Sequence, residues 1–299
     1  MRTNNIALRF NIRFVPNYHS FWVVLLAITL SSCSFFEEEV IPILEDNSNT
    51  SLALGNPSNA RASFLEPNNF LIERTEYALS YNNERGIPNW VSWHLDRSWI
   101  GSTDRAETFK TDPFLNNDFN VVSSSDYTNS GFDRGHNCPS ADRTRSTQSN
   151  EATFFMTNIV PQAPRHNQGP WKDMEEFGRD LVFEGNELYV VMGNFGVGGT
   201  GSKGYVEKIG RNSNVVVPKY IWKVYVVLPE DDNDLLRVDE STRVIAVIIE
   251  NTNEGLKAWH EYRISVDEIE DATGLDLFSE LPFFVQSALE SKIDDGPVN

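Results

Sequence analysis

Five segments rich in β-branched and aromatic residues recur along the chain, and residues typical of turns separate them. They cover residues 89–95, 153–159, 187–192, 220–228 and 243–250. Runs of this composition are typical of buried β-strands. A chain that must bury so many strands can fold only around a sheet, and the order of its helices then decides which kind of sheet.

Helical patterns are fewer and do not alternate with the strands. One begins at Pro170, where proline suits a first helical turn, and two more cover residues 266–271 and 281–292. An irregular order of strands and helices favours an α+β fold over a doubly wound one. We therefore expect a largely antiparallel central sheet flanked by helices.

The first 33 residues have the features of an export signal. A basic start is followed by the apolar run FWVVLLAITL at residues 21–30, and LSSC ends the segment at Cys33. Ten apolar residues are too few to cross a bilayer, which needs about 20, but they suit a signal peptide. LSSC resembles the lipobox of bacterial lipoproteins. This resemblance implies a signal peptide at residues 1–32, a lipid on Cys33 and an anchor in the membrane.

Ser34 follows the cysteine where an aspartate would mark inner-membrane retention, so we expect an outer-membrane lipoprotein that faces the periplasm or the exterior. An ordinary signal peptide with a chance cysteine, or an N-terminal anchor helix, is the alternative. Residues 33–62 are polar and lack periodicity, so we expect a flexible tether there and a single domain at residues 63–292. Once Cys33 carries lipid, Cys138 stands alone, and no intrachain disulfide can form.

The charge distribution limits which partners this chain can bind. The formal net charge is −18, which repels polyanions at long range. Residues 229–299 hold 18 acidic and five basic residues, so much of the negative charge lies toward the C-terminal end. We expect the remaining cations of the central segment to form a local positive patch made of Arg105, Arg134, Arg143, Arg145, Arg165 and Lys172.

Several common catalytic motifs are missing from the sequence. No two histidines have the spacing of a zinc site, and there is no G-x-S-x-G elbow for a serine nucleophile. The glycine-rich residues 193–204 lack the G-K-[ST] ending of a phosphate loop, and a flexible hairpin is the better interpretation. Cys138 is expected to be a small buried residue rather than a nucleophile.

One ordered set of motifs has the components for phosphodiester hydrolysis. DRGH spans residues 133–136, TNIVPQ spans 157–162, NQGPW spans 167–171, and Glu175 follows. Hydrolysis needs a base for water, a cation at the phosphate and positive charge for the transition state. Histidine can be the base, an asparagine oxygen suits Mg²⁺, and arginine matches phosphate oxygens.

This set resembles the DNA/RNA non-specific endonucleases of the ββα-metal superfamily, and the resemblance covers about residues 70–285. It implies a ββα-metal unit within the fold and a Mg²⁺-dependent endonuclease, with Mn²⁺ as a possible substitute. Such an enzyme would hydrolyse DNA, and by the same chemistry RNA, with little sequence preference. Homodimers occur among relatives, but the sequence has no distinct interface signal.

The resemblance also implies a role for each residue. His136 would be the general base and Asn167 the direct metal ligand, while Glu175 would hold metal-bound water. Asn158 would position the site through hydrogen bonds, and Arg134 and Arg105 would bind the phosphate. Asp133 is expected to orient the loop or the imidazole rather than to bind metal.

Plainer interpretations exist for most of these residues. Asn158 and Asn167 could be ordinary turn residues, Glu175 a solvated helix residue and Arg105 a surface residue. At the level of the whole protein, two alternatives share the fold. One is a non-catalytic nucleic-acid-binding surface lipoprotein, and the other is a phosphodiesterase for small nucleotides, which a closed pocket would distinguish.

Overall fold

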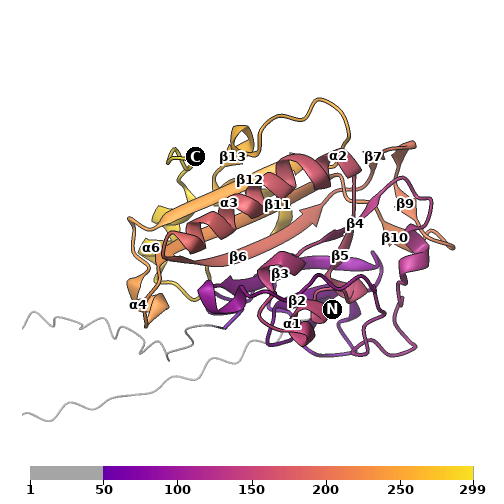
Figure 1. The fold of residues 1–299 in the computed structure, drawn as a ribbon, viewed down its shortest axis with the longest axis horizontal. Coiled ribbons are helices and arrows are strands. Elements are labelled where there is room, and N and C mark those ends of the chain that lie inside the picture. The colour runs from indigo at the N-terminus through magenta and orange to yellow at the C-terminus, as the bar shows by residue number, and fades with distance from the viewer. Residues whose placement is uncertain (1–49, 299) are drawn as a thin grey trace, which may run out of the picture. The chain divides into compact units, whose positions relative to one another are not determined.

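A seven-stranded antiparallel sheet is the centre of the computed structural model, which describes residues 50–298 (Figure 1). The strand order is β1-β2-β3-β6-β11-β12-β13. Together with helices on both faces, this sheet confirms the expected α+β class. The strands are β1 (Phe70–Glu73), β2 (Ala78–Asn82), β3 (Ile87–Leu95), β6 (Asn186–Phe195), β11 (Tyr220–Pro229), β12 (Arg243–Glu250) and β13 (Arg263–Ile264).

The central strands are apolar throughout because both faces of the sheet are buried. Along β11, Ile221 and Tyr225 point into one core, while Trp222 and Val224 point into the other. This alternation follows from the two-residue period of a strand. β11 pairs along its length with β6 on one side and with β12 on the other, so its backbone groups are satisfied as well.

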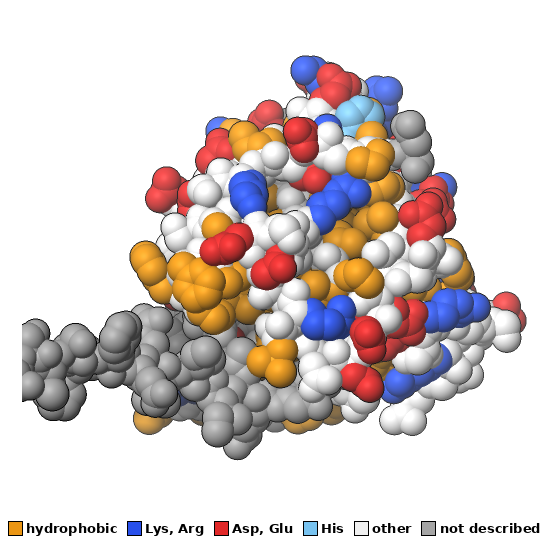
Figure 2. Space-filling view, turned by 90° about the vertical axis from the view of Figure 1, so that its left-hand side faces the viewer, with side chains coloured by type: hydrophobic (Ala, Val, Ile, Leu, Met, Phe, Trp, Pro, Cys, Tyr) orange, Lys and Arg blue, Asp and Glu red, His pale blue; other side chains and the backbone are white. Residues whose placement is uncertain are grey.

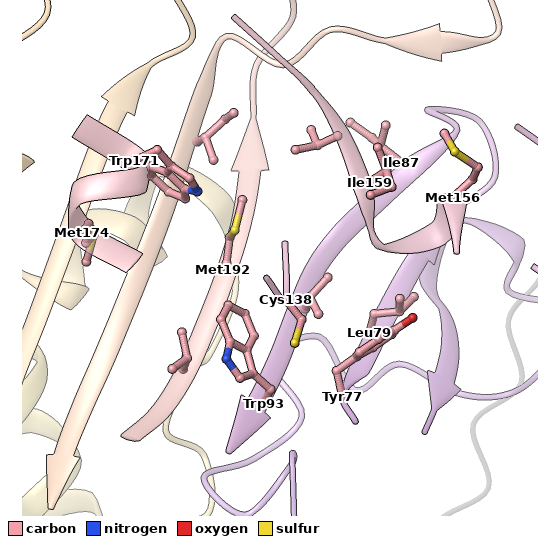
Figure 3. Packing of buried hydrophobic residues seen from close by; sticks show 14 of the residues in the cluster. Tyr77, Leu79, Ile87, Trp93, Cys138, Met156, Ile159, Trp171, Met174 and Met192 are labelled. Atoms are coloured by element: carbon pink, nitrogen blue, oxygen red, sulfur yellow. The ribbon is translucent and has the colours of Figure 1, made fainter. Parts of the chain in front are cut away.

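Helices close both cores. Helix α3 (Lys172–Phe183) lies across β6 and β11 in Figure 1, and its Met174, Phe177 and Leu181 belong to the first core. Figure 3 shows Trp171 and Met174 beside the sheet residues Met192 and Trp93. Helices α5 (Val266–Thr273) and α6 (Phe283–Glu290) cover the second core.

A long insertion between β3 and β6 builds a small ββα unit. Its strands β4 (Asp133–His136) and β5 (Ile159–Gln162) form an antiparallel pair. The short helix α2 (Pro164–His166) and a π-helical turn (Asn167–Trp171) then lead into α3. The insertion also contains α1 (Thr147–Ala152). The ββα unit therefore stands where the motifs predicted it.

The prediction of a strand at residues 153–159 is wrong. The chain turns there, a 3₁₀ helix covers Met156–Asn158, and β5 begins only at Ile159. Backbone hydrogen bonds with Lys110 hold this turn, at N–O distances of 3.0 Å to Phe154 and 2.8 Å from Met156. A short apolar run cannot distinguish a strand from a buried turn by its pattern alone.

The other sequence expectations agree with the structure more closely. The glycine-rich segment forms a hairpin from β7 (Gly199–Gly201) and β8 (Gly204–Val206). The expected helix from Pro170 becomes α3 two residues later, and residues 266–271 and 281–292 contain α5 and α6. The remaining short elements are β9 (Lys208–Ile209), β10 (Val215–Val216) and α4 (Asp234–Arg237).

The ordered domain extends beyond the boundaries expected at residues 63 and 292. Leu54 is buried, its carbonyl accepts a hydrogen bond from the Glu280 N–H at 3.2 Å, and Ser58 accepts one from the Trp90 indole at 2.8 Å. The tether expectation therefore does not hold for residues 50–62, because they pack against the domain. At the other end, Asp294 lies between Arg243 and Arg263.

The expected signal peptide, Cys33 and residues 33–49 of the tether lie outside the described residues. Among residues 50–298, no helix is both long and apolar enough to cross a bilayer. Figure 2 shows the end of the domain at which α4 and α6 lie in Figure 1. Acidic, basic and apolar side chains are interspersed on this face, so it does not present the continuous positive surface that favours a polyanion.

Candidate active site

Strand β4 carries the DRGH motif, and its alternation decides which side chains face the cleft. Arg134 and His136 are two residues apart and therefore project to the same side. Both line a pocket of about 350 Å³, which Arg105, Asn167 and Glu175 also line. The structure thus brings five of the six predicted site residues to one cleft. A second pocket of about 470 Å³ shares Arg105, Arg134 and Asn167 with the first.

His136 lies half-buried between two aromatic rings. The ring centroids of Phe154 and Phe109 are 4.8 Å and 5.4 Å from the imidazole centroid. The Nε2 atom is buried and has no hydrogen-bond partner among residues 50–298, which leaves Nδ1 as the nitrogen that can meet a solvent molecule. Burial, and then the charge of Arg105, lowers the pKa of His136 to about 3. The imidazole is therefore neutral at physiological pH and can accept a proton.

Gly135 is required by the tight pairing of β4 with β5. A Cβ at this position would overlap Oε1 of Gln162, which crosses over it from β5. Gln162 cannot move easily because it is buried and its amide nitrogen lies 2.7 Å from Nδ1 of His166. The glycine of DRGH therefore allows the two strands, and with them His136 and Asn167, to approach closely.

Asp133 positions the side chain of Asn167. One of its oxygens, Oδ2, accepts hydrogen bonds from Nδ2 of Asn167 at 2.9 Å and from Nε2 of Gln168 at 2.8 Å. The Asn167 amide nitrogen is thereby committed to the carboxylate. Its oxygen has no hydrogen-bond partner among the described residues. Asn167 lines both pockets. Asp133 orients a loop side chain, as expected, although its target is Asn167 rather than the imidazole.

Glu175 lies one and a half turns beyond the kink at Gly169 and is paired with a buried lysine. Nζ of Lys223 on β11 is 3.2 Å from Oε1 of Glu175, and it also lies 4.4 Å from the ring centroid of Trp171. Burial raises the pKa of Glu175 even though the Lys223 charge acts to lower it. The second carboxylate oxygen has no hydrogen-bond partner among residues 50–298. The pair leaves one acidic oxygen for the cleft.

The two arginines of the cleft are held differently. Arg105 donates a hydrogen bond to the Ser140 hydroxyl, and its guanidinium lies 5.0 Å from the centroid of the Phe154 ring. Arg134 lies over the Phe109 ring at 4.7 Å and donates to a backbone carbonyl at 3.3 Å. Each keeps further N–H donors for an anion. Arg105 is therefore part of the site, not an isolated surface residue.

Asn158 does not line the cleft. It is fully buried, and its Oδ1 accepts from the Cys138 N–H while its Nδ2 donates to the carbonyls of Cys138 and Thr153, each at 2.9 Å. Asn158 was expected both to belong to the catalytic residues and to position the site through hydrogen bonds. Its contacts fit only the positioning role. Its hydrogen bonds fix the chain directly after His136.

Cys138 itself is fully buried, and burial raises the pKa of its thiol to about 12. It is a core residue of this loop, as expected.

The expected positive patch forms only in part, because Arg105, Arg134 and Lys172 line one pocket while Arg145 and Arg165 do not. Arg143 is fully buried, where it donates to the carbonyls of Glu76 and His94 and stacks on Trp99. It therefore cannot meet a polyanion. Arg179 on α3 also lines the cleft, but it is paired with Asp142 at 2.9 Å. The burial of Arg143 could not be predicted from the sequence because it depends on distant partners.

The chain that forms this cleft is similar to known proteins. The family model described as DNA/RNA non-specific endonuclease matches residues 56–284. A protein named "Nuclease" from Nostoc sp. is 42% identical over 91% of this chain and 97% of its own length. The chain belongs to the DNA/RNA non-specific endonuclease family. The nuclease of Serratia marcescens is 29% identical over 75% of this chain and 80% of its own length.

Two further comparisons of this endonuclease are with human EXOG and with a solved EndoG/EndoGI complex. Human mitochondrial nuclease EXOG is 31% identical over 69% of this chain, which spans only 56% of that protein. The solved EndoG/EndoGI complex contains a chain with a TM-score of 0.61 and 22% identity, covering 78% of this chain and 91% of that chain. The second likeness shows the same ββα-metal fold.

Two groups of side chains elsewhere in this endonuclease could hold a cation. His94, Glu187 and Asp234 are all buried, but Arg237 already pairs with both carboxylates and compensates part of their charge. Asp267, Glu270 and Glu290 form the other group. The residues of both groups lie on elements packed around the second core, on the face of the sheet opposite α3.

Sequence reasoning missed two parts of the endonuclease site. Lys223 was not predicted as a site residue, although a lysine within the buried strand YIWKVYVVL is itself a signal of a paired charge. Phe109 and Phe154 flank His136 and had no motif to mark them.

Proposed function

We propose that this nuclease hydrolyses phosphodiester bonds of DNA and RNA with little sequence preference, with His136 as general base and one hydrated Mg²⁺ held by Asn167. The observation that carries the proposal is the commitment of the Asn167 amide nitrogen to Asp133, which leaves the amide oxygen for a cation. A binding module would not need such a clamp beside a neutral, half-buried imidazole.

His136 accepts the proton of the attacking water. Its lowered pKa keeps it neutral, and Nδ1 is the nitrogen that the cleft reaches. A tilted contact with Phe109 and an edge-to-face contact with Phe154 fix the plane of the ring, so the accepting nitrogen has one direction. Positioned bases of this kind contribute about 10²- to 10⁴-fold to a rate.

The oxygen atoms of the cleft suit Mg²⁺. Asn167 offers a neutral oxygen, and Glu175 offers one carboxylate oxygen beyond the one paired with Lys223. Mg²⁺ prefers oxygen ligands and keeps several waters, and Mn²⁺ accepts the same donors. When bound, the ion would neutralise charge on the scissile phosphate and on the leaving oxygen. Glu175 would hold water of the ion's hydration shell.

Arg105 and Arg134 bind the phosphate. They border both pockets, so a strand that runs from one pocket to the other passes between them. Their guanidinium groups match phosphate oxygens without reading a base, which fits a nuclease with little sequence preference. The two pockets are open clefts rather than a closed cavity, and this favours a polymer over a small nucleotide.

The test is cleavage of supercoiled plasmid by the full-length chain kept in detergent. Nicking in Mg²⁺ that is lost in EDTA and in His136→Ala supports the proposal. His260→Ala is the matched control, because His260 lies outside the cleft, and it should nick normally. Plasmid and RNA that both stay intact would overturn the proposal. Retained DNA binding would then favour the binding protein, and hydrolysis of dinucleotides the small-nucleotide enzyme.

We also propose that the nuclease is a lipoprotein of the bacterial outer membrane, anchored through lipid on Cys33. The support is the sequence of residues 21–33 alone. Cys33→Ala should move the protein from the membrane fraction to the soluble fraction. The mass of the N-terminal peptide should decrease by that of the acyl chains. An unchanged distribution would contradict a lipid anchor at this residue.

A further inference from the structure

We propose that Asp267, Glu270 and Glu290 form a second, structural site for a divalent cation, with Ca²⁺ as the best match. The site joins the two helices that cover the second core. Asp267 and Glu270 lie three residues apart on α5, and Glu290 is the last residue of α6, which packs against it. This inference does not depend on the proposed nuclease mechanism.

The distances between the three carboxylates suit one ion. An oxygen of each lies within 4.8 Å of an oxygen of the others. Ca²⁺ binds oxygen at about 2.3–2.6 Å, so one ion can reach three oxygens with this spacing. Asp267 is exposed and Glu270 half-buried, which leaves room for the waters that complete a coordination shell of six to eight ligands.

Glu290 provides the observation that points to a ligand. Only 6% of this residue is exposed, and its Oε1 is buried with no hydrogen-bond partner among residues 50–298. A buried carboxylate with an unpaired oxygen is costly unless its charge is neutralised. Its position at the C-terminal end of α6 adds to the cost, because the helix dipole is negative there.

The surroundings of Glu290 supply no positive charge. Within residues 50–298, neither Glu290 nor Asp267 nor Glu270 takes part in an ion pair. Burial, and then the charge of Glu270, raises the pKa of Glu290 to about 7, while a hydrogen bond with Gln286 acts to lower it. A bound cation would supply the counter-charge that these carboxylates lack.

One carboxylate of the cluster is already oriented by the backbone. Oε1 of Glu270 accepts a hydrogen bond from the Leu277 N–H at 2.7 Å, which fixes the side chain across the end of α5. Glu290 is the other hydrogen-bonding neighbour of this carboxyl, so the two acidic groups lie side by side. Because α6 leads directly into residues 291–298, a cation here would tie the C-terminal segment to α5.

The experiment measures thermal unfolding of the full-length chain in detergent at pH 8, in EDTA and with increasing CaCl₂. Asn167→Ala serves as the background, so that binding in the nuclease cleft does not contribute. Calcium at about 100 times its dissociation constant should raise the midpoint by about 5 °C or more. Adding Glu290→Gln should abolish the rise. Glu230→Gln, an exposed acid after β11, is the matched control and should keep it.

The variants remain informative even though they change a buried residue. Glu290→Gln removes an unpaired charge, so its midpoint in EDTA should equal or exceed that of the parent. Asp267→Asn changes an exposed residue and should weaken the response to calcium without unfolding the domain. A midpoint that does not change with calcium but rises when the pH is lowered from 8 to 6 would overturn the proposal. It would indicate that the carboxylates share a proton instead of a cation. An equal rise with and without Glu290→Gln would also overturn it.

Discussion

Asp133 and Asn167 are 34 residues apart in sequence, yet Oδ2 of the first accepts a hydrogen bond from Nδ2 of the second at 2.9 Å. The contact joins β4, which carries His136, to the turn that begins α3. It sets the orientation of the Asn167 amide and hence the direction of its oxygen. The proposed base and the proposed metal ligand are thereby held on one small ββα unit.

Loss of this contact should weaken metal binding more than DNA binding. In Asp133→Ala, the Asn167 side chain can rotate, and the Mg²⁺ concentration for half-maximal nicking should rise about 10- to 100-fold. Gln168→Ala is the matched control, because Gln168 donates to the same oxygen but is not expected to bind metal. A Mg²⁺ dependence that is the same in Asp133→Ala and in the parent would contradict this role of Asp133.

Gly135→Ala should disrupt the site through packing alone. The added methyl group would push Gln162 away from His166 and separate β4 from β5. Overpacking of this kind costs about 1–3 kcal/mol of unfolding free energy. Urea denaturation should show this loss together with lower activity. Gly135→Ala combined with Gln162→Ala removes the clash and should recover most of the stability; a double variant as unstable as the single one would exclude this clash as the cause.

Lys223→Met should destabilise the domain by leaving Glu175 without its counter-charge. Breaking a buried ion pair by removing one partner costs about 3–5 kcal/mol. Without Lys223, the pKa of Glu175 should rise further, because that lysine acts to lower it. Denaturant titration should show a smaller loss when Glu175→Gln is added. The exposed Lys219→Met is the control and should change stability by less than about 0.5 kcal/mol; additive effects of the two pair mutations would argue against coupling.

Asp294 should make stability depend on pH at the C-terminal end. Burial acts to raise the pKa of this carboxyl, but hydrogen bonds from Arg243 and Arg263 outweigh it and lower the pKa. A lowered carboxyl pKa adds stability that is complete above the unfolded value of about 3.9 and is lost as pH falls through the folded value. Asp294→Asn should therefore cost about 2 kcal/mol at pH 7 and much less near pH 3. Asp295→Asn, its exposed neighbour, should cost little at either pH.

Much of the fold could be predicted from the sequence because its signals are local. β12 begins and ends at the residues that its apolar run indicates, and β6 and β11 differ from expectation by a few residues at their ends. The turn at residues 153–158 could not be predicted in this way. It is held by backbone hydrogen bonds with Lys110 and by hydrogen bonds between the Asn158 side chain and Cys138, and both partners are distant in sequence.

The site was predictable where residue type alone decides the chemistry. His136, Asn167 and Arg134 reach one cleft as the motifs indicated. The supporting contacts were not predictable, because Lys223 comes from a strand 48 residues after Glu175 and its pairing depends on how α3 lies across the sheet. The burial of Arg143 was hidden for the same reason, since its acceptors Glu76 and His94 are 67 and 49 residues away.

The most direct test of the account is the single-turnover rate of DNA cleavage by the parent and by His136→Ala, at saturating DNA and Mg²⁺. The account predicts a rate lower by about 10²- to 10⁴-fold in His136→Ala, with DNA affinity and the unfolding midpoint little changed. Equal cleavage rates in the two proteins would contradict the assignment of His136 as the general base.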